Sequence, residues 1–511
     1  MKSAKLVCIT AIALFAAIAS PAGIAAQDNH NSDKHHHYKL IDVGTFGGPV
    51  SYINNDPSGG GGASGILNPH GSVVGAADTS IPDPNYPNSC LLCGPFIFHA
   101  FQWQDGSLVD LGALPGVNSS FANWISPKGL VAGFSENGTI DPLLGVPEVD
   151  AVLWKDGEIV NLGTIEGGYE SNAFAVNDRG QVAGVFLNTI PDPFSVFGLQ
   201  LRAFLWQNGV MEDLGTLGGT DVGANFINER GQVAGTSSTN TTPNPNNGSY
   251  CPPNVPTQDP FLWENGKMTD LGTLGGTCGV PNALNNRGQV VGLSDTAGDV
   301  YYHAFLWPGK NNQMQDLGTL GGCCAIANWV NDSGAVVGGS YTLNDQGFHA
   351  FLWKQEVMTD LTKVSSECSM ALGINSKDQV VGFTCFEADG GDAVLWDEGQ
   401  EIDLNIFNYP GSGLQNLQLA YNINDRGEID GLGVPPGCGD PFACGLAFVL
   451  IPCDENHPGV EGCDYSMMEA PIAVPQTSPA ARDASSRMLP QSLMRRMNPH
   501  HFPGRAFSSR N

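Results

Sequence analysis

The stretch DLGTLGG at residues 213–219 occurs again at residues 270–276 and 316–322. A glycine-rich turn after an apolar strand can hold phosphate, but such a loop serves one site and requires a strand before it and a helix after it. Three copies in one chain are typical of a structural repeat instead. We therefore interpret these glycines as turn residues, and we expect the aspartate of each copy to bond local backbone amides.

The three copies belong to a longer unit, which reads H-A-F-L-W, a turn, D-L-G-T-L-G-G and then A-x-x-I-N-x-x-G-Q-V-V-G. Self-similarity of this kind, at a period of 43–57 residues, indicates a repeat fold. The tryptophan that ends the first segment occurs at Trp103, Trp154, Trp206, Trp263, Trp307, Trp353 and Trp396. The glycine that ends the last segment occurs at Gly75, Gly133, Gly184, Gly235, Gly292, Gly338, Gly382 and Gly431.

Each unit contains four short apolar or alternating runs separated by turn residues, which predicts four strands. In the copy of H-A-F-L-W at residues 303–307, alternate side chains point to opposite faces, and both faces are apolar. Such a strand must be covered on both sides, as it is in a sheet held between identical neighbours. The segment NDRGQ at residues 177–181 reads as a hairpin turn in which Gly180 takes a positive φ. Four-stranded units at this period predict an all-β chain folded as a β-propeller.

The two ends of the repeat array complement each other. The array starts at residues 38–44 with a second-strand segment, YKLIDVG, and ends at residues 446–451 with a first-strand segment, LAFVLI. We therefore predict eight four-stranded blades, closed into a ring by pairing of the N- and C-terminal strands. A ring of seven blades and a β-solenoid are the alternatives, although a solenoid would need a cap at each end.

The segments outside the array predict the destination of the protein. Residues 1–26 read as a signal peptide, because Lys2 and Lys5 precede an apolar run that ends in small residues. We assign residues 27–37 to a linker, 38–452 to the propeller, 453–464 to a short disulfide-containing extension and 465–511 to a disordered basic tail. No segment is long and apolar enough to predict a membrane span. The expected location is extracellular or periplasmic.

The cysteines agree with this location. The chain has 13, and an even number suited to disulfide pairing remains once Cys8 of the signal peptide is set aside. Cys323 and Cys324 are adjacent and have no assigned partner. The candidate pairs that are close in sequence are Cys90 with Cys93, Cys251 with Cys278, Cys368 with Cys385, Cys438 with Cys444, and Cys453 with Cys463.

The net charge of −29 and the pI near 4.4 limit the partners. Nucleic acid is excluded as a partner because its phosphates would be repelled, and anionic membrane surfaces are disfavoured for the same reason. We expect a monomer whose ligand is a polysaccharide or another protein.

The combined motif resembles the HAF (His-Ala-Phe) repeat, which is found in secreted, mainly bacterial proteins. The resemblance covers about residues 38–451 and departs from the pattern in two units, where DLTKVSS and DLNIFNYPGSG replace the glycine-rich turn. It implies an extracellular repeat protein. It implies no activity, so no catalytic residue is assigned from it.

Function is expected in the loops that break the repeat. The longest, at residues 76–98, 134–150, 185–201 and 236–259, fall on one face of the predicted ring. Irregular loops on a regular scaffold are where binding residues concentrate. The sequence therefore predicts a binding or surface-interaction module, and the candidate ligand contacts are Tyr86, Phe194, Phe197 and Tyr250.

Two other functions stay open. An extracellular carbohydrate-active hydrolase or lyase could use carboxylates of the same face, and the candidates are Glu148, Glu170, Asp221 and Asp295. The chain could also be a structural component of an envelope or matrix. No catalytic motif is present, and we expect no cofactor. The acidic segment at residues 295–299 is suited to Ca²⁺ but lacks a full ligand pattern.

Overall fold

The computed structural model describes residues 37–53, 65–87, 94–141, 145–165, 167–195, 197–245, 251, 254–309, 313–363, 368–384, 391–438 and 441–463. The residues predicted to form the signal peptide and the basic tail, and most of those predicted to form the linker, therefore lie outside the described residues. So do Cys90, Cys93, Cys385 and Tyr250.

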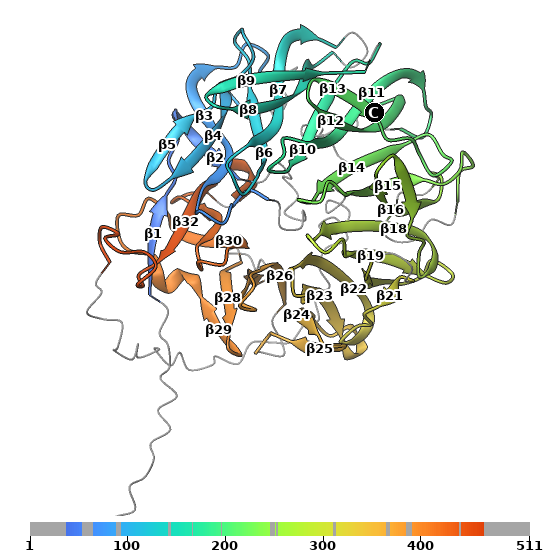
Figure 1. Cartoon of the computed structure of the whole chain (residues 1–511). Coiled ribbons are helices and arrows are strands. Elements are labelled where there is room, and N and C mark those ends of the chain that lie inside the picture. The colour runs from blue at the N-terminus through green and yellow to red at the C-terminus, as the bar shows by residue number, and fades with distance from the viewer. Residues whose placement is uncertain are drawn as a thin grey trace, which may run out of the picture.

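The described chain forms eight antiparallel four-stranded units arranged as a ring (Figure 1). The first four blades consist of the following strands. Blade 1 is β2 (Gly47–Tyr52), β3 (Val73–Pro82), β4 (Phe96–Gln104) and β5 (Ser107–Asp110); blade 2 is β6 (Ser120–Ile125), β7 (Val131–Ile140), β8 (Pro147–Lys155) and β9 (Glu158–Gly163). Blade 3 is β10 (Ser171–Val176), β11 (Val182–Pro191), β12 (Leu199–Gln207) and β13 (Val210–Asp213); blade 4 is β14 (Val222–Ile227), β15 (Val233–Ser238), β16 (Gln258–Glu264) and β17 (Lys267–Asp270).

The remaining blades follow the same order. Blade 5 is β18 (Gly275–Leu284), β19 (Val290–Thr296), β20 (Tyr302–Trp307) and β21 (Gln315–Asp316); blade 6 is β22 (Gly321–Val330), β23 (Val336–Thr342), β24 (Phe348–Lys354) and β25 (Val357–Asp360). Blade 7 is β26 (Ser369–Ile374), β27 (Val380–Thr384), β28 (Ala393–Asp397) and β29 (Gln400–Asp403); blade 8 is β30 (Asn416–Ile423), β31 (Ile429–Val434), β32 (Leu446–Pro452) and β1 (Tyr38–Asp42). Helical segments are short: η1 (Leu343–Asp345), η2 (Leu404–Phe407) and α1 (Pro441–Cys444).

Strand β1 closes the ring, as the complementary ends of the array predict. It pairs antiparallel with β32, from Tyr38 opposite Pro452 to Asp42 opposite Phe448. The N-terminal strand is therefore the outer strand of a blade whose other three strands come from the C-terminal end. The prediction of an eight-bladed β-propeller closed in this way is confirmed.

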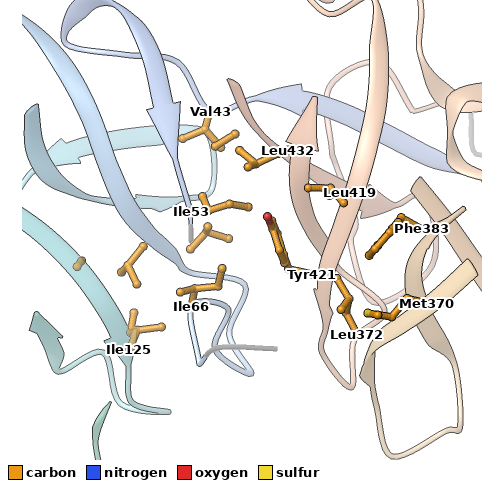
Figure 2. Packing of buried hydrophobic residues seen from close by; sticks show 14 of the residues in the cluster. Val43, Ile53, Ile66, Ile125, Met370, Leu372, Phe383, Leu419, Tyr421 and Leu432 are labelled. Carbon is orange, nitrogen blue, oxygen red and sulfur yellow. The ribbon is translucent and has the colours of Figure 1, made fainter. Parts of the chain in front are cut away.

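An apolar cluster supports the closure on its inner side. Figure 2 shows Tyr421 of β30 between Leu419 of the same strand and Ile53, which follows β2. The cluster continues to Leu372 of blade 7 and Ile125 of blade 2, and its members are almost fully buried. It therefore joins the last blades of the chain to the first ones, which no local contact could do.

The H-A-F-L-W strand is covered on both faces, as its composition predicts. Ala304 and Leu306 of β20 cluster with Ala325 of blade 6. Phe305 and Trp307 face the other way and cluster with residues of blade 4. Each third strand therefore packs between its two neighbouring blades, and the repeated tryptophan is a core residue.

The aspartate of D-L-G bonds a backbone amide two residues later, as predicted. The distance between the side-chain oxygen and this amide nitrogen is 2.6–2.9 Å in all eight blades, with Asn161 in place of aspartate in blade 2. In three blades the same carboxylate also pairs with a histidine of the third strand. Nδ1 of His99, His303 and His349 lies 2.8–3.0 Å from Asp110, Asp316 and Asp360. The D-L-G motif thus stabilises the turn that leaves the outer strand of one blade and leads to the next blade.

A relay of buried asparagines links the blades at the opposite end of the inner strands. The asparagine of I-N accepts backbone N–H bonds from its own hairpin turn and donates from Nδ2 to the backbone oxygen at the equivalent position of the next blade. The donors are Asn68, Asn177, Asn228, Asn285, Asn331, Asn375 and Asn424, at 2.9–3.5 Å. The last of these, Asn424, donates to Asn68 across the closure. In blade 2, Ser126 stands at this position and has no amide to donate.

Three predicted disulfides are present, at Cys251–Cys278, Cys438–Cys444 and Cys453–Cys463. Cys368 is also disulfide-bonded. Cross-links of this kind are typical of proteins in oxidising, extracellular environments. Cys323 and Cys324 are free thiols. None of the helices in the described ranges has the length and apolarity needed to cross a membrane.

Candidate interaction face

Three of the four long connections predicted to carry function, at residues 76–98, 134–150 and 185–201, begin and end as antiparallel strand pairs in blades 1 to 3. The described part of the fourth, at residues 236–259, has an isolated bridge between Asn244 and Val255. Strands β3, β7 and β11 each have 10 residues, whereas β15, β19, β23, β27 and β31 at the same place in the other blades have 5–7. The extra residues continue the second strand of the blade beyond its neighbours. Three consecutive blades therefore carry projecting hairpins on the loop face.

The three hairpins share one irregularity. In each, three residues of the second strand face a single residue of the third strand, between the pairs Asp78–Phe98 and Pro82–Phe96 in blade 1. The equivalent interruptions follow Glu136 in blade 2 and Leu187 in blade 3. A bulge of this kind bends a strand pair and redirects its side chains.

Side chains hold the bulges in place. Oδ1 of Asn188 accepts the N–H of Ile190 at 2.9 Å, and Oγ1 of Thr79 accepts that of Ile81 at 3.1 Å. Asn137 holds Thr139 in the same way in blade 2. The same short turn thus recurs on three blades and places the following residues in equivalent positions.

An aromatic cluster packs beneath the hairpins. Phe121 lies between Phe98 and Phe134, with ring centroids 6.4 and 5.9 Å apart. Phe197, predicted as a ligand contact, belongs to this cluster and is only 7% exposed. It is a core residue of the hairpins instead and offers no ring face to a ligand, because neighbouring apolar side chains such as Leu201 surround it.

Apolar side chains are exposed above this cluster. Ile81, Ile140 and Ile190 are 46%, 51% and 53% exposed, and Tyr86 at the end of the first hairpin is 48% exposed. Ile81 and Ile190 occupy the same position in their bulges, and Ile140 stands one residue later. We call these four residues the hairpin crest.

Of the ligand contacts predicted from the sequence, Tyr86 belongs to the hairpin crest. Phe194 is half-buried in the turn of the third hairpin, where its N–H donates to Asp192. Tyr250 lies outside the described residues. The sequence analysis did not predict the three isoleucines, because it considered only aromatic residues as ligand contacts. The recurrence of I-P-D-P and I-D-P in the loop sequences is the signal that could have identified them.

Buried carboxyl groups lie at the base of the hairpins. Burial raises the pKa of Glu136 to about 7, and the Asp83 carboxylate adds to this effect. Burial likewise raises the pKa of Asp78 and of Asp221 to about 7. Each carboxyl accepts a backbone N–H that the ladders leave free, as Glu136 does from Ser119 at 2.8 Å. These acids are therefore structural acceptors at the start of inner strands.

The other acids considered for catalysis are also engaged in the structure. Glu148 accepts a hydrogen bond from Asn137, and Asp221 accepts the N–H of Leu201 at 2.9 Å. Asp295 is fully buried, and Glu170 is 4% exposed. Within the described ranges, no group of three histidine, cysteine, aspartate or glutamate side chains could hold a metal ion.

Glu136→Gln tests the structural role of the buried acids. The pKa of Glu136 is raised in the folded protein, so the ionised carboxylate is less stable there than in the unfolded chain. Its ionisation therefore lowers the free energy of unfolding, fully so once the pH exceeds about 7. Glutamine keeps an acceptor for Ser119 without the charge. We expect the free energy of unfolding of the variant to exceed that of the wild type by roughly 2–3 kcal/mol at pH 8, a difference that shrinks through pH 7 and vanishes below about pH 4.5.

Urea unfolding between pH 4 and pH 8 measures this difference. The control is Glu158→Gln, at an exposed position of β9, which should leave the pH dependence unchanged. If Glu136→Gln and the wild type had the same free energy of unfolding at every pH, Glu136 would not be a buried acid whose ionisation destabilises the fold.

Comparison with known proteins finds similarity only to solved structures, at low sequence identity. No protein-family model and no curated protein sequence matches it. It is similar to the β-propeller domain of the trilobed protease from Pyrococcus furiosus, at 10% identity and a TM-score of 0.38, over 68% of this chain and 100% of that one. It is also similar to dipeptidyl peptidase 4 from Porphyromonas gingivalis, at 10% identity and a TM-score of 0.44, over 70% of this chain and 56% of that one. A gluconolactonase from Xanthomonas campestris matches at 11% identity and a TM-score of 0.27, over 67% and 92% of the two chains. At such scores the similarities carry no argument about activity.

Proposed function

We propose that the chain is an extracellular binding module that holds a protein partner on the hairpin crest. The observation that supports this is the exposure of Ile81, Ile140 and Ile190 on three consecutive hairpins of one face. Single exposed apolar residues are ordinary, but the same kind of side chain at near-equivalent places on adjacent blades forms a repeated feature. Exposed apolar surface of this kind marks interaction sites.

The chemistry of the crest favours a protein over a polysaccharide. Sugars bind to flat aromatic rings, and Tyr86 is the one exposed aromatic residue among the crest residues. Branched aliphatic side chains suit the apolar centre of a protein interface instead. The aromatic cluster beneath the crest packs the bases of the three hairpins together, and a surface formed before binding loses less entropy on binding.

The location outside the cytoplasm is part of the same proposal. It is supported by the disulfides and by the resemblance of the repeat to HAF proteins, which we propose as the family of this chain. Three of the acids at this face do not favour the enzymatic alternative, because Glu136, Asp221 and Glu148 accept hydrogen bonds from backbone or side-chain groups of the fold.

The experiment compares the wild type with two triple variants of the purified chain. The crest variant replaces Ile81, Ile140 and Ile190 with serine. The control variant replaces Val109, Val210 and Val357 with serine, since these are 51%, 67% and 59% exposed on outer strands away from the crest. Each protein is immobilised and exposed to the extracellular proteins of the source organism and, separately, to soluble and insoluble polysaccharides, with sugar release measured in the same tubes.

We expect at least one protein that the wild type and the control variant retain equally and the crest variant retains about tenfold less, as for loss of an interface centre. A polysaccharide retained through the crest would replace the protein ligand by a sugar. Release of sugar would replace the binding module by an enzyme. A partner lost equally from both triple variants would overturn the choice of the crest.

A further inference from the structure

Blades 5, 6 and 7 each have a cysteine at the same position of the inner strand. It directly precedes the residue at which regular pairing with the second strand begins. The residues are Cys278, Cys324 and Cys368, each followed by the residue that pairs with the second strand. Cys278 is bonded to Cys251, and Cys368 is disulfide-bonded. Cys324 is a thiol, and so is its neighbour Cys323. One of three equivalent positions therefore differs in its chemistry.

The two described connections beside Cys324, residues 297–301 and 343–347, contain no cysteine, which distinguishes Cys324 from Cys278. Cys251, the partner of Cys278, comes from the connection between β15 and β16 of the preceding blade. The equivalent connection beside Cys324 is residues 297–301, between β19 and β20, and it contains no cysteine. Among the described cysteines, the free thiol next to Cys324 is that of Cys323, the adjacent residue.

The local backbone brings the two thiols together at the loop face. Strand β22 leaves its regular register between Gly321 and Ala325, so that this segment is free of ladder pairing. The N–H of Cys323 donates to a side-chain oxygen of Asp345 at 2.7 Å, which fixes the backbone of this segment next to an acid. Cys323 is half-buried, whereas Cys324 is 6% exposed. An external molecule can therefore reach the first sulfur but not the second.

We propose that Cys323 and Cys324 form a thiol–disulfide exchange site for small disulfides, in which Cys323 attacks and Cys324 resolves. The Cys323 thiolate attacks one sulfur of a disulfide RSSR, which forms a mixed disulfide and releases RS⁻. Cys324 then loses its proton and attacks the Cys323 sulfur, which forms the Cys323–Cys324 bond and releases the second RS⁻. Two protein thiols are oxidised to one disulfide, and RSSR is reduced to two thiols.

The adjacency of the two residues makes this disulfide easy to reduce again. Consecutive Cα atoms are about 3.8 Å apart, below the separation of roughly 4.4–6.8 Å that an unstrained disulfide takes. The Cα atoms of the three described disulfides are 5.5–6.0 Å apart, within that range. Strained disulfides are the labile ones, so the adjacent pair would cycle under conditions that leave the others closed.

The surroundings of the pair set its rate. Burial raises the pKa of the Cys323 thiol, and Cys324 and the Asp345 carboxylate add to this effect. The pKa of Cys324 is raised by burial as well, with Asp345 and Asp295 as the nearby acids. Thiolate is the reactive form, so attack is slow while Asp345 is charged. Asp345→Asn should therefore speed the first step by a factor of about three to ten.

The test uses the full folded chain, treated with a mild excess of reduced glutathione, freed of it and then exposed to oxidised glutathione. Remaining thiols are trapped by alkylation, the protein is digested, and the mass of the peptide that contains Cys323 and Cys324 is measured by mass spectrometry. We expect the wild-type peptide to lose two hydrogens with no lasting glutathione adduct. Cys324→Ser should stop at the adduct on Cys323, and Cys323→Ser should react about tenfold more slowly, since Cys324 is buried.

The pair Cys453–Cys463 serves as an internal control and should stay closed throughout. A stable glutathione adduct on the wild type would overturn the proposal, as would Cys323→Ser reacting at the wild-type rate. Pairing of either cysteine with a third one would also overturn it. If a variant fails to fold, the wild-type peptide still tests the proposal, because a stable adduct or pairing with a third cysteine would be seen there.

Discussion

Gly292→Ala is expected to lower the free energy of unfolding by about 4 kcal/mol or more, a large part of the stability of an ordinary domain. Gly292 ends the V-V-G segment of β19, and a Cβ built on it lies 2.0 Å from the backbone oxygen of Val280 in the inner strand. Backbone atoms on both sides fix this distance, so no side chain can move away to relieve the clash. Thermal or urea unfolding followed by tryptophan fluorescence measures the loss.

The same contact occurs at the glycine of V-V-G in every blade. An added Cβ would lie 1.9–2.1 Å from an inner-strand carbonyl oxygen at Gly75, Gly133, Gly184, Gly235, Gly292, Gly338, Gly382 and Gly431. Seven of the inner strands also shift register at this point, as between Pro281 and Ala283 in blade 5. The glycine is required because two backbones approach closely, whereas its φ is ordinary.

Gly298→Ala is the matched control in the same blade. Gly298 has a φ of +93° and no heavy atom within 4 Å of an added Cβ. Alanine there should cost only the left-handed backbone conformation, about 1–2 kcal/mol. Equal losses for Gly292→Ala and Gly298→Ala would show that close approach does not explain the repeated glycine.

Asn285→Ala is expected to cost about 3 kcal/mol of unfolding free energy. The Asn285 side chain makes four hydrogen bonds while 5% exposed. Its Oδ1 accepts from the N–H groups of Arg287 and Gln289, at 3.0 and 2.9 Å, and its Nδ2 donates to the Gln289 side chain and to the next blade. Alanine leaves the backbone groups of the turn buried and without these partners, and it breaks one link of the asparagine relay.

Asn286→Ala, one residue later, is the control for this variant. Asn286 is exposed, and its Oδ1 accepts the N–H of Glu229 at 3.0 Å. Its loss should cost less than about 1 kcal/mol, because water can replace an exposed partner. Asn285→Ser copies the residue of blade 2 and should fall between the two. Urea midpoints of the three variants decide the order, and an Asn285→Ala midpoint near that of Asn286→Ala would remove the relay as an explanation of the I-N motif.

Local chemistry made much of the architecture predictable from the sequence. The turn residues and the spacing of the tryptophans indicate four strands per unit, and the D-L-G aspartates bond amides only two residues away. The closure was predictable because residues 38–44 and 446–451 each lack what the other supplies. The disulfides Cys438–Cys444 and Cys453–Cys463 were predictable from short separation along the chain.

The candidate site was less accessible to such reasoning. The sequence predicted that the site lies in the irregular loops. It did not predict that these loops fold as hairpins, that Phe197 is buried or that the three isoleucines are exposed. A side chain in a loop is buried or exposed according to what the next blade places over it. Phe197 is covered by a cluster that draws on three blades, whereas Ile190, seven residues earlier, is not.

The sequence by itself determined the repeat, the strand order within a blade, the turn chemistry and the complementary ends, because each depends on residues close together in the chain. Only the tertiary structure decided why V-V-G ends in glycine, how the asparagines link the ring, which apolar side chains face solvent and which cysteines lack a partner. These properties arise where one blade meets the next, across 40 or more residues of chain, as between Asn285 and Asn331. Residues that make the same contact between neighbouring blades recur in every repeat unit. Their recurrence in the sequence indicates that the contact is needed, but it does not show which residue of the next blade they contact.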